Sequence, residues 1–189
     1  MKKTDKRILK TQQELLDAFV SLSKEKEINA ISVSELTKRA GISRATFYLH
    51  YKDPDDMLQQ LSQQLLTELV KMIEEETSKS TMAAFYGVFR CIRENEKIAS
   101  LILSTDTTLT FVYQMDQLVR RLFKDDFAEE FDLSNSSSNW TNYLITFIVG
   151  GSAGIILKWF EEGMQESEEE MGHLLYQTVI QGTRYIGKE

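Results

Sequence analysis

Cysteine and proline are almost absent from this 189-residue sequence, which has one of each, Cys91 and Pro54. A single cysteine excludes a disulfide framework within the chain, as suits a reducing compartment. Because proline interrupts helices, its scarcity, together with apolar residues at helical spacing, predicts an all-α protein. The N-terminal segment MKKTDKRILK has no apolar run long enough for a secretory signal, so we expect a cytoplasmic protein.

Histidine is also rare, with His50 and His173 far apart in the sequence and Cys91 without a neighbouring ligand. A zinc or iron site needs several such side chains to converge, so we expect no metal site and no cofactor. The sequence shows no nucleophile elbow, and GGSAG at residues 150–154 lacks the lysine and strand of a phosphate-binding loop. These features argue against an enzyme.

Positive charge is concentrated at one end of a chain whose net charge is −7. Residues 1–52 carry 11 Lys and Arg against 6 Asp and Glu, a net charge of +5. The remainder carries 11 against 23, a net charge of −12. The basic segment suits attraction to DNA phosphates, whereas we interpret the acidic remainder as a solvated surface.

The most informative segment is residues 31–58, ISVSELTKRAGISRATFYLHYKDPDDML. It predicts two short helices around a glycine turn, followed by a third helix that opens at Asp-Pro. Ser32 and Glu35 have the spacing of a capping box, in which each side chain bonds a backbone amide of the other's turn. Gly41 supplies the turn, and Ser43 can cap the second short helix.

The second short helix combines two aromatic residues with an unusual polar set. Phe47 and Tyr51 are four residues apart and can pack inward together. The polar side chains would be costly in a core but suit a DNA groove. We expect Arg44 and Thr46 to face base edges, because base contacts give specificity. The side chains expected along the DNA backbone are Tyr48, His50 and Lys52.

The start of the preceding helix adds a predicted phosphate contact. Ser32 and Ser34 lie at a helix N-terminus, where backbone amides favour an anion. The complete set of expected DNA-binding residues is Ser32, Ser34, Ser43, Arg44, Thr46, Tyr48, His50 and Lys52.

This segment resembles the DNA-binding head of TetR-type transcriptional regulators, whose signature is approximately I(S/T)(V/T)xxLAxxAGVSxxTxYxHFxxKExL. The matching residues are Ile31, Ser32, Val33, Leu36, Ala40, Gly41, Ser43, Thr46, Tyr48, His50 and Leu58. Lys52 fits the basic residue that commonly follows the aromatic position. The chain departs from the pattern at Pro54, where many members have a second lysine, so the phosphate contact of that lysine is not implied here.

The rest of the chain is predicted to be helical around one loop. Residues 6–25 form a first helix, whose apolar face is Ile8, Leu15, Leu16, Phe19 and Leu22. Further helices are expected near 54–77, 80–94, 96–104, 107–124, 139–163 and 168–186, with a loop in KDDFAEEFDLSNSSSN. We divide the chain into a helix-turn-helix DNA-binding domain, residues 1–53, and a helical effector-binding and dimerisation domain, residues 54–189.

Residues 134–157 contain no charged side chain, so a membrane span is an alternative. The strongly apolar part, residues 143–149, is too short to cross about 30 Å of hydrocarbon, and we interpret it as part of a buried helix with no membrane contact. Its small residues, among them Gly150, Gly151 and Gly154, indicate close helix packing, a kink or a ligand cavity. We expect this helix and the last one to form a homodimer interface; packing within one subunit is the alternative.

Aromatic residues of the second domain can line an effector pocket, although helical spacing places most of them in the core. They are Phe85, Tyr86, Phe89, Phe111, Tyr113, Phe147, Trp159 and Phe160. The segment GGSAGIILKWFEEGMQESEEEM also resembles the body of a TetR subgroup that includes dihydroxyacetone-kinase-type regulators.

By resemblance, the chain is expected to be a TetR-like repressor. Such a protein binds a palindromic double-stranded DNA operator as a homodimer and is controlled by a small-molecule effector. The competing hypothesis is a helical interaction module that acts through a partner protein, as a coactivator or antagonist.

Overall fold

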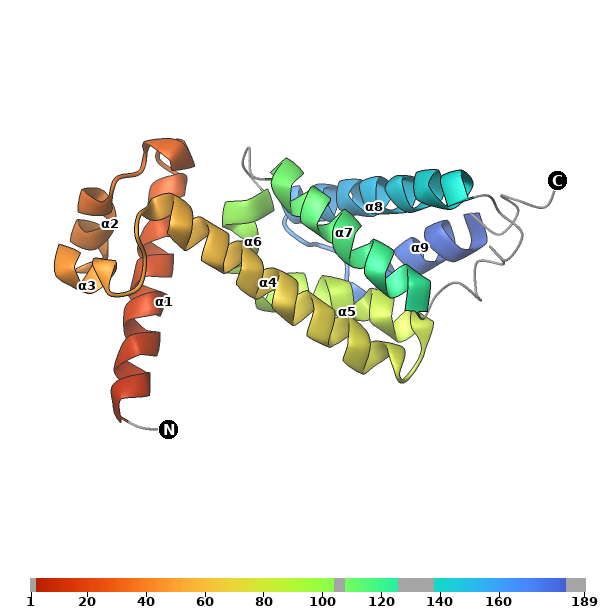
Figure 1. Cartoon of the computed structure of the whole chain (residues 1–189), viewed down its shortest axis with the longest axis horizontal. Coiled ribbons are helices and arrows are strands. Elements are labelled where there is room, and N and C mark those ends of the chain that lie inside the picture. The colour runs from red at the N-terminus through yellow and green to blue at the C-terminus, as the bar shows by residue number, and fades with distance from the viewer. Residues whose placement is uncertain (1–2, 104–107, 126–137, 183–189) are drawn as a thin grey trace. The chain divides into compact units, whose positions relative to one another are not determined.

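The computed structural model describes residues 3–103, 108–125 and 138–182 (Figure 1). Every regular element within these residues is a helix, which confirms the all-α prediction. The elements are α1 (Lys3–Ser23), the 3-10 turn η1 (Ile28–Ala30), α2 (Val33–Ala40), α3 (Arg44–Tyr48), α4 (Pro54–Thr77), α5 (Thr81–Glu94), α6 (Glu96–Leu103), α7 (Thr108–Asp125), α8 (Ser138–Glu161), α9 (Glu168–Tyr176) and the π-helical segment η3 (Gln177–Gln181). Most of the predicted loop, residues 126–137, lies outside the described residues.

The helices group into two compact units. The head unit contains α1, α2, α3, the part of α4 up to Leu65, and α6. The body unit contains α4 from Leu66 onwards, α5, α7, α8, α9 and η3. The helix α4 therefore contributes residues to both units.

The core of the head unit is formed by apolar side chains from each of its helices. Its fully or nearly fully buried members include Leu15, Phe19, Leu36, Phe47, Met57, Leu65, Ala99 and Leu101. The prediction that Ile8 belongs to this apolar face is wrong, because its side chain is 41% exposed. The first turns of α1 run beyond α2 and α3 (Figure 1).

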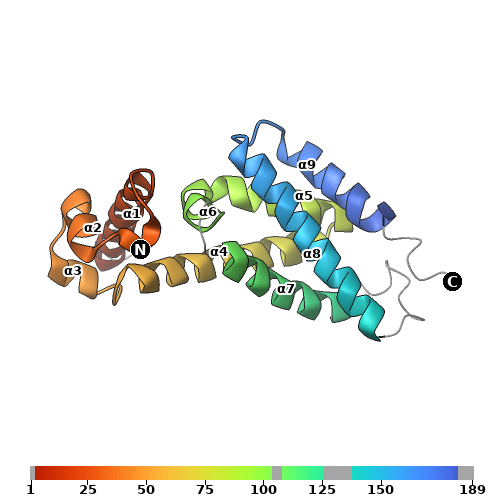
Figure 2. The ribbon, with the colours of Figure 1, turned by 90° about the horizontal axis from the view of Figure 1, so that it is seen from above.

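The body unit is organised around two helix pairs, α5 with α9 and α7 with α8 (Figure 2). Phe89 on α5 meets Trp159 on α8 edge to face, with ring centroids 5.1 Å apart. Arg120 on α7 donates to the Asn142 side chain and the Thr146 hydroxyl of α8, at 2.9 Å each. These contacts join α8 to both α5 and α7.

The helix α8 is buried on one face only, which corrects the prediction of a buried helix. Leu144, Ile145 and Ile148 are buried, whereas Tyr143 is 74% and Phe147 is 65% exposed. By length and composition alone, Thr141–Glu161 could cross a membrane, although the core helix of a soluble protein passes the same test. Within its most apolar stretch, 22% of the residues are buried. A position in the core therefore does not explain the apolar side chains on the exposed face of α8.

The aromatic residues of the body unit divide in the same way. Phe89, Phe111 and Trp159 are buried, as predicted from helical spacing. Tyr113 on α7 and Phe147 on α8 are each 65% exposed, so these two residues do not lie in the core. Both lie on the outer side of a helix that packs through its opposite face.

Candidate nucleic-acid interface

The turn between α2 and α3 has the geometry predicted from Gly41. This residue ends α2 in the left-handed conformation, with φ of 69° and ψ of 27°, and its amide bonds the Thr37 carbonyl. A left-handed residue at a helix end is usually glycine, because a Cβ atom is strained there. Ser43 then caps α3, its hydroxyl accepting the Thr46 amide at 3.0 Å. The turn and the cap therefore fix the direction in which α3 leaves α2.

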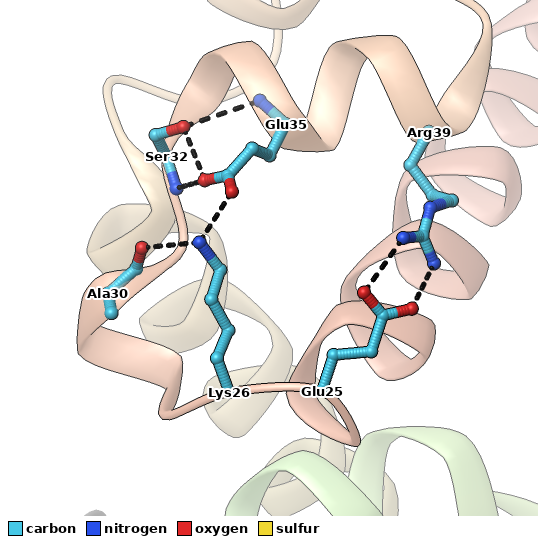
Figure 3. A network of polar contacts seen from close by, with 6 residues as sticks. All are labelled: Glu25, Lys26, Ala30, Ser32, Glu35 and Arg39. Carbon is cyan, nitrogen blue, oxygen red and sulfur yellow. Dashed lines mark hydrogen bonds and ion pairs between the residues drawn. The ribbon is translucent and has the colours of Figure 1, made fainter.

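The start of α2 is tied to the preceding turn by a polar network (Figure 3). The Glu35 carboxylate accepts the Ser32 amide at 3.0 Å and the Ser32 hydroxyl at 2.6 Å, which confirms the predicted capping box. The Lys26 ammonium donates to the same carboxylate and, at 2.9 Å, to the Ala30 carbonyl. With the hydrogen bond from Lys26 as the largest cause, followed by those from Ser32, the pKa of Glu35 falls to about 2.

A second ion pair ties the end of α2 to the residues that follow α1 (Figure 3). The Arg39 guanidinium donates to both carboxylate oxygens of Glu25, at 2.8 and 3.0 Å. This bidentate geometry lowers the pKa of Glu25 and raises that of Arg39. Together with the Lys26–Glu35 contact, it braces both ends of α2, the helix from which α3 projects.

The inward side of α3 is anchored by aromatic packing. Phe47 has no exposed surface and Tyr51 is 5% exposed, as predicted from their spacing. Their ring centroids are 5.7 Å apart, and burial raises the pKa of Tyr51. Because both side chains point into the head unit, the residues on the opposite side of α3 must face outward.

The outward side of α3 consists of Arg44, Ala45, Tyr48 and Leu49, all of which are exposed. Tyr48 is 58% and Leu49 is 82% exposed. The predicted DNA-binding set includes Arg44 and Tyr48 from this side but not Ala45 and Leu49, which are apolar. Their spacing of four residues on one side of a helix is the signal that could have found them.

Thr46 and His50 lie at the margin of this outward side. Both are half-buried, and the Thr46 hydroxyl lies 2.8 Å from the Ser43 hydroxyl. The Ser43 and Thr46 hydroxyls thus form part of the cap of α3. A methyl group remains on Thr46 for contact with a neighbouring surface.

The segment after α3 is fixed by reciprocal capping at the start of α4. Asp53 accepts the Asp56 amide at 2.8 Å, and Asp56 accepts the Lys52 amide at 2.8 Å. The bond from the Lys52 backbone is the main reason that the pKa of Asp56 is lowered. Pro54 occupies the first helical position, where its missing N–H costs nothing. Lys52 is left exposed directly beyond α3.

Residues 3–103, 108–125 and 138–182 contain no group of three or more His, Cys, Asp or Glu side chains that could hold a metal ion. His50 is half-buried beside Tyr51, and His173 is exposed on α9.

The contacts of α2 and α3 described above give the head unit a braced helical surface. Basic, aromatic and apolar side chains are exposed on it.

Two family models match the chain. The model of bacterial regulatory proteins of the tetR family matches residues 15–61. The model of a transcriptional regulator C-terminal region matches residues 79–181, which is more than half of the chain. Both models, like the similar proteins, describe transcriptional regulators and not enzymes.

Curated relatives agree with these models. The chain is 25% identical over 179 residues to the HTH-type regulator YxbF of Bacillus subtilis, covering 89% of this chain and 44% of the relative. It is 26% identical to the fatty acid metabolism regulator protein of the same organism, covering 54% of this chain and 50% of that protein. The chain thus spans half or less of the length of these two relatives.

Solved structures share the fold. The fatty acid degradation regulator FadR from Bacillus halodurans has a TM-score of 0.66 and 14% identity, covering 92% of this chain and 96% of that chain. The dihydroxyacetone kinase operon activator DhaS has a TM-score of 0.62 and 19% identity, with the same coverage. Given the two family models and the helix-turn-helix geometry of α2 and α3, the chain belongs to the TetR family of bacterial transcriptional regulators.

Proposed function

We propose that the chain is a repressor that binds a palindromic DNA operator as a homodimer, with α3 as the recognition helix in the major groove. The observation that carries the proposal is the outward side of α3, where exposed side chains project from a helix anchored by Phe47 and braced through α2. Members of the TetR family bind DNA and typically act as dimers, which supports the proposal. The net charge of +5 over residues 1–52 adds attraction to phosphate.

Within the recognition helix we assign base contacts to Arg44 and Thr46. An exposed arginine suits the O6 and N7 acceptors of guanine. Since the Thr46 hydroxyl lies against Ser43, its methyl group is the part proposed to meet a base. The residues assigned to the DNA backbone are Tyr48, His50 and Lys52.

The start of α2 is proposed as a phosphate contact. Ser34 is exposed there, one helical turn before the exposed Lys38. Ser32 is exposed as well, but its hydroxyl and amide are bonded to Glu35, so its contribution is mainly to fix the helix start. Helix N-termini favour anions through their backbone amides. Like Ser32, Ser43 is proposed to contribute mainly by capping its helix, because its hydroxyl accepts the Thr46 amide at the start of α3.

A dimer through α8 and α9 is proposed because these helices expose apolar side chains. Tyr143 and Phe147 on α8 and Leu174 on α9 are 74%, 65% and 47% exposed. A Cβ atom added at Gly150 or Gly154 would meet nothing within 4 Å, so a partner backbone can approach closely there. Exposed apolar patches of this kind mark association surfaces.

We also propose control by a small-molecule effector, which the division into two units supports. We assign DNA binding to residues 1–53 and effector binding and dimerisation to residues 54–189. The continuous helix α4 contributes to both units and is the proposed mechanical link. A ligand shifts the DNA-binding state only if it binds one arrangement better than the other. Two similar proteins are named for fatty acid metabolism or degradation, so fatty acids belong in the first compounds tested.

A gel-shift titration with the DNA upstream of the protein's own gene tests the proposal. Binding should weaken steeply with salt, because phosphate contacts release counterions. Arg44→Ala should change which base pairs are preferred. Lys52→Ala should weaken all sequences about equally and reduce the salt slope by about 2, which is about 1 for the contact of each subunit. Lys71→Ala, which removes one charge from an exposed side chain of α4, is the matched control.

Two results would count against the proposal. Equal loss of selectivity from Arg44→Ala and Lys52→Ala would contradict the assignment of base and backbone contacts. Binding that occurs only when another protein is added would support the competing hypothesis, an interaction module that works through a partner.

A further inference from the structure

We propose that Ala45 and Leu49 form an apolar reading surface for thymine, with Leu49 in contact with the C5-methyl group of a T in each operator half-site. This inference rests on the proposed function, since it assigns a base preference to the same helix. It adds a specificity-determining residue that the polar pattern of α3 does not indicate.

The first observation is the exposure of Leu49. Its side chain is 82% exposed, although Phe47 two residues earlier has no exposed surface. Ala45, one helical turn before Leu49, is exposed on the same side. Two apolar side chains are therefore exposed one helical turn apart on the outward side of α3, next to Arg44 and Tyr48 in the sequence.

The second observation is that the position of Leu49 is fixed. Its amide donates to the Thr46 carbonyl at 3.3 Å, and the following amide of His50 donates to the Phe47 carbonyl at 2.9 Å. Phe47 and Tyr51 fill the core on the inward side. Leu49 therefore cannot turn into the head unit, and its exposure is a property of the folded helix.

The third observation is the charge around the pair, which favours DNA over a protein surface. Arg44 and Lys52 are exposed close to it in the sequence, and residues 1–52 carry a net charge of +5. Within the major groove, the thymine methyl is the apolar feature of the base edges, and apolar side chains contact it. An apolar pair in a basic setting thus matches a T beside the guanine expected for Arg44.

The spacing of Ala45 and Leu49 along the helix determines how far apart the base pairs they contact can be. Four residues of α-helix rise about 6 Å, somewhat less than two base-pair steps of about 3.4 Å. Ala45 and Leu49 can therefore contact base pairs that are about two steps apart. The small Ala45 side chain lets the helix approach closely, and the longer Leu49 reaches the methyl group.

The test begins with selection of bound sequences from random duplex DNA by the full-length protein. Each T of the selected site is then replaced singly by deoxyuridine, which removes only the methyl group. At one T per half-site, wild-type binding should weaken about fourfold, the effect of losing burial of one methyl-sized group. Leu49→Ala, which removes the contact from both half-sites, should bind the T-containing site about 16-fold more weakly and should show no further loss with deoxyuridine.

Two control measurements keep the result specific. Leu109→Ala removes a leucine that is 81% exposed on α7 and should retain the full deoxyuridine effect. Because Leu49 is exposed, Leu49→Ala should melt at the wild-type temperature, so weaker binding cannot be ascribed to unfolding.

The outcomes separate this inference from the proposed function. A selected site that tolerates deoxyuridine at every T overturns the role of Leu49 but leaves sequence-specific binding intact. If a Leu49→Ala variant remains as sensitive to deoxyuridine as the wild type, that result likewise overturns the role of Leu49 and leaves sequence-specific binding intact. Selection that yields no preferred sequence overturns the proposed function and, with it, the reading surface.

Discussion

Gly172 on α9 lies against Tyr86 on α5 so closely that a Cβ atom on Gly172 would be 2.2 Å from the Tyr86 Cδ1 atom. The same atom would be 2.8 Å from the Tyr86 backbone N and Cα atoms, which cannot move aside as a flexible side chain can. The close approach of α5 and α9 therefore depends on the absence of a side chain at this position.

Gly172→Ala should destabilise the protein, because the two helices must separate to accommodate the methyl group. Overpacking of this kind costs about 1–3 kcal/mol. Urea denaturation followed by circular dichroism measures the change in the free energy of unfolding. His173→Ala, at the exposed neighbouring position, should change it by less than about 0.5 kcal/mol. Equal effects of the two substitutions would show that the close approach is unimportant.

The Glu35 network predicts a pH dependence of head stability. The pKa of the Glu35 carboxyl group, about 2, lies below the ordinary value of 4.5, so the ionised carboxylate stabilises the fold above pH 4.5. This contribution is lost as the pH falls from 4.5 towards 2. The melting temperature of Glu35→Gln should therefore lie below that of the wild type at pH 7, and the gap should narrow in this window.

The Ser32 hydroxyl and amide both bond the Glu35 carboxylate, which supplies a control. In a protein that already carries Ser32→Ala, Glu35→Gln should lower the melting temperature at pH 7 by a smaller amount, because the hydrogen bond from the Ser32 hydroxyl is already lost. Ser32→Ala itself should cost about 1 kcal/mol as the loss of a helix cap. A gap between Glu35→Gln and wild type that stays constant from pH 7 to pH 2 would contradict the assignment.

The exposed aromatic residues of α8 predict an effect on assembly. Phe147→Asp should shift the protein from dimer to monomer at micromolar concentration, because a carboxylate would be buried without a partner in the interface. Sedimentation equilibrium reports the mass directly. Leu109→Asp places the same charge on α7, at a leucine that is 81% exposed, and should leave the dimer intact. A wild-type protein that is monomeric in this experiment removes the dimer proposal altogether.

Arg93 fastens the connection between α8 and α9 and should not tolerate lysine. Its guanidinium donates to the carbonyls of Met164 at 3.0 Å and Glu166 at 2.9 Å, and lies 5.0 Å from the Trp159 ring centroid. Lysine has a single side-chain nitrogen, so it cannot place one nitrogen against these carbonyls and another against the Glu168 carboxylate, as Arg93 does with Nη2 and Nε. Arg93→Lys should therefore cost about 1–2 kcal/mol of unfolding free energy, measured by urea titration. An unchanged urea midpoint would show that the connection is held by other contacts.

Local rules account for what could be predicted from the sequence of the head. The Ser32–Glu35 box, the Gly41 turn and the Asp53–Pro54 opening of α4 each depend on residues within a few positions of one another. Such contacts form wherever the backbone is helical, so spacing alone identifies them. The exposure of Leu49 depends instead on which side of α3 faces the core, and an apolar residue gives no sign of facing out.

The surface of α8 could not be predicted, for a different reason. Its side chains are apolar around most of the helix, so no periodic pattern distinguishes the buried Leu144 from the exposed Phe147. Ile8 fits the helical stripe of α1 but is exposed, whereas Leu15 and Phe19 of the same stripe are buried. In both cases the outcome depends on neighbouring helices or partners, which periodicity does not describe.

A hydroxyl-radical footprint of the full-length protein on its selected DNA site tests the central claim most directly. Two recognition helices related by a two-fold axis should protect two symmetric patches on one side of the duplex, about one helical turn or ~34 Å apart. Both patches should weaken on this site with Arg44→Ala, which loses the preferred base contact, and should persist with Lys71→Ala. A single unsymmetric patch, or protection that survives Arg44→Ala unchanged, would contradict the account of α3 as the DNA-reading helix of a dimer.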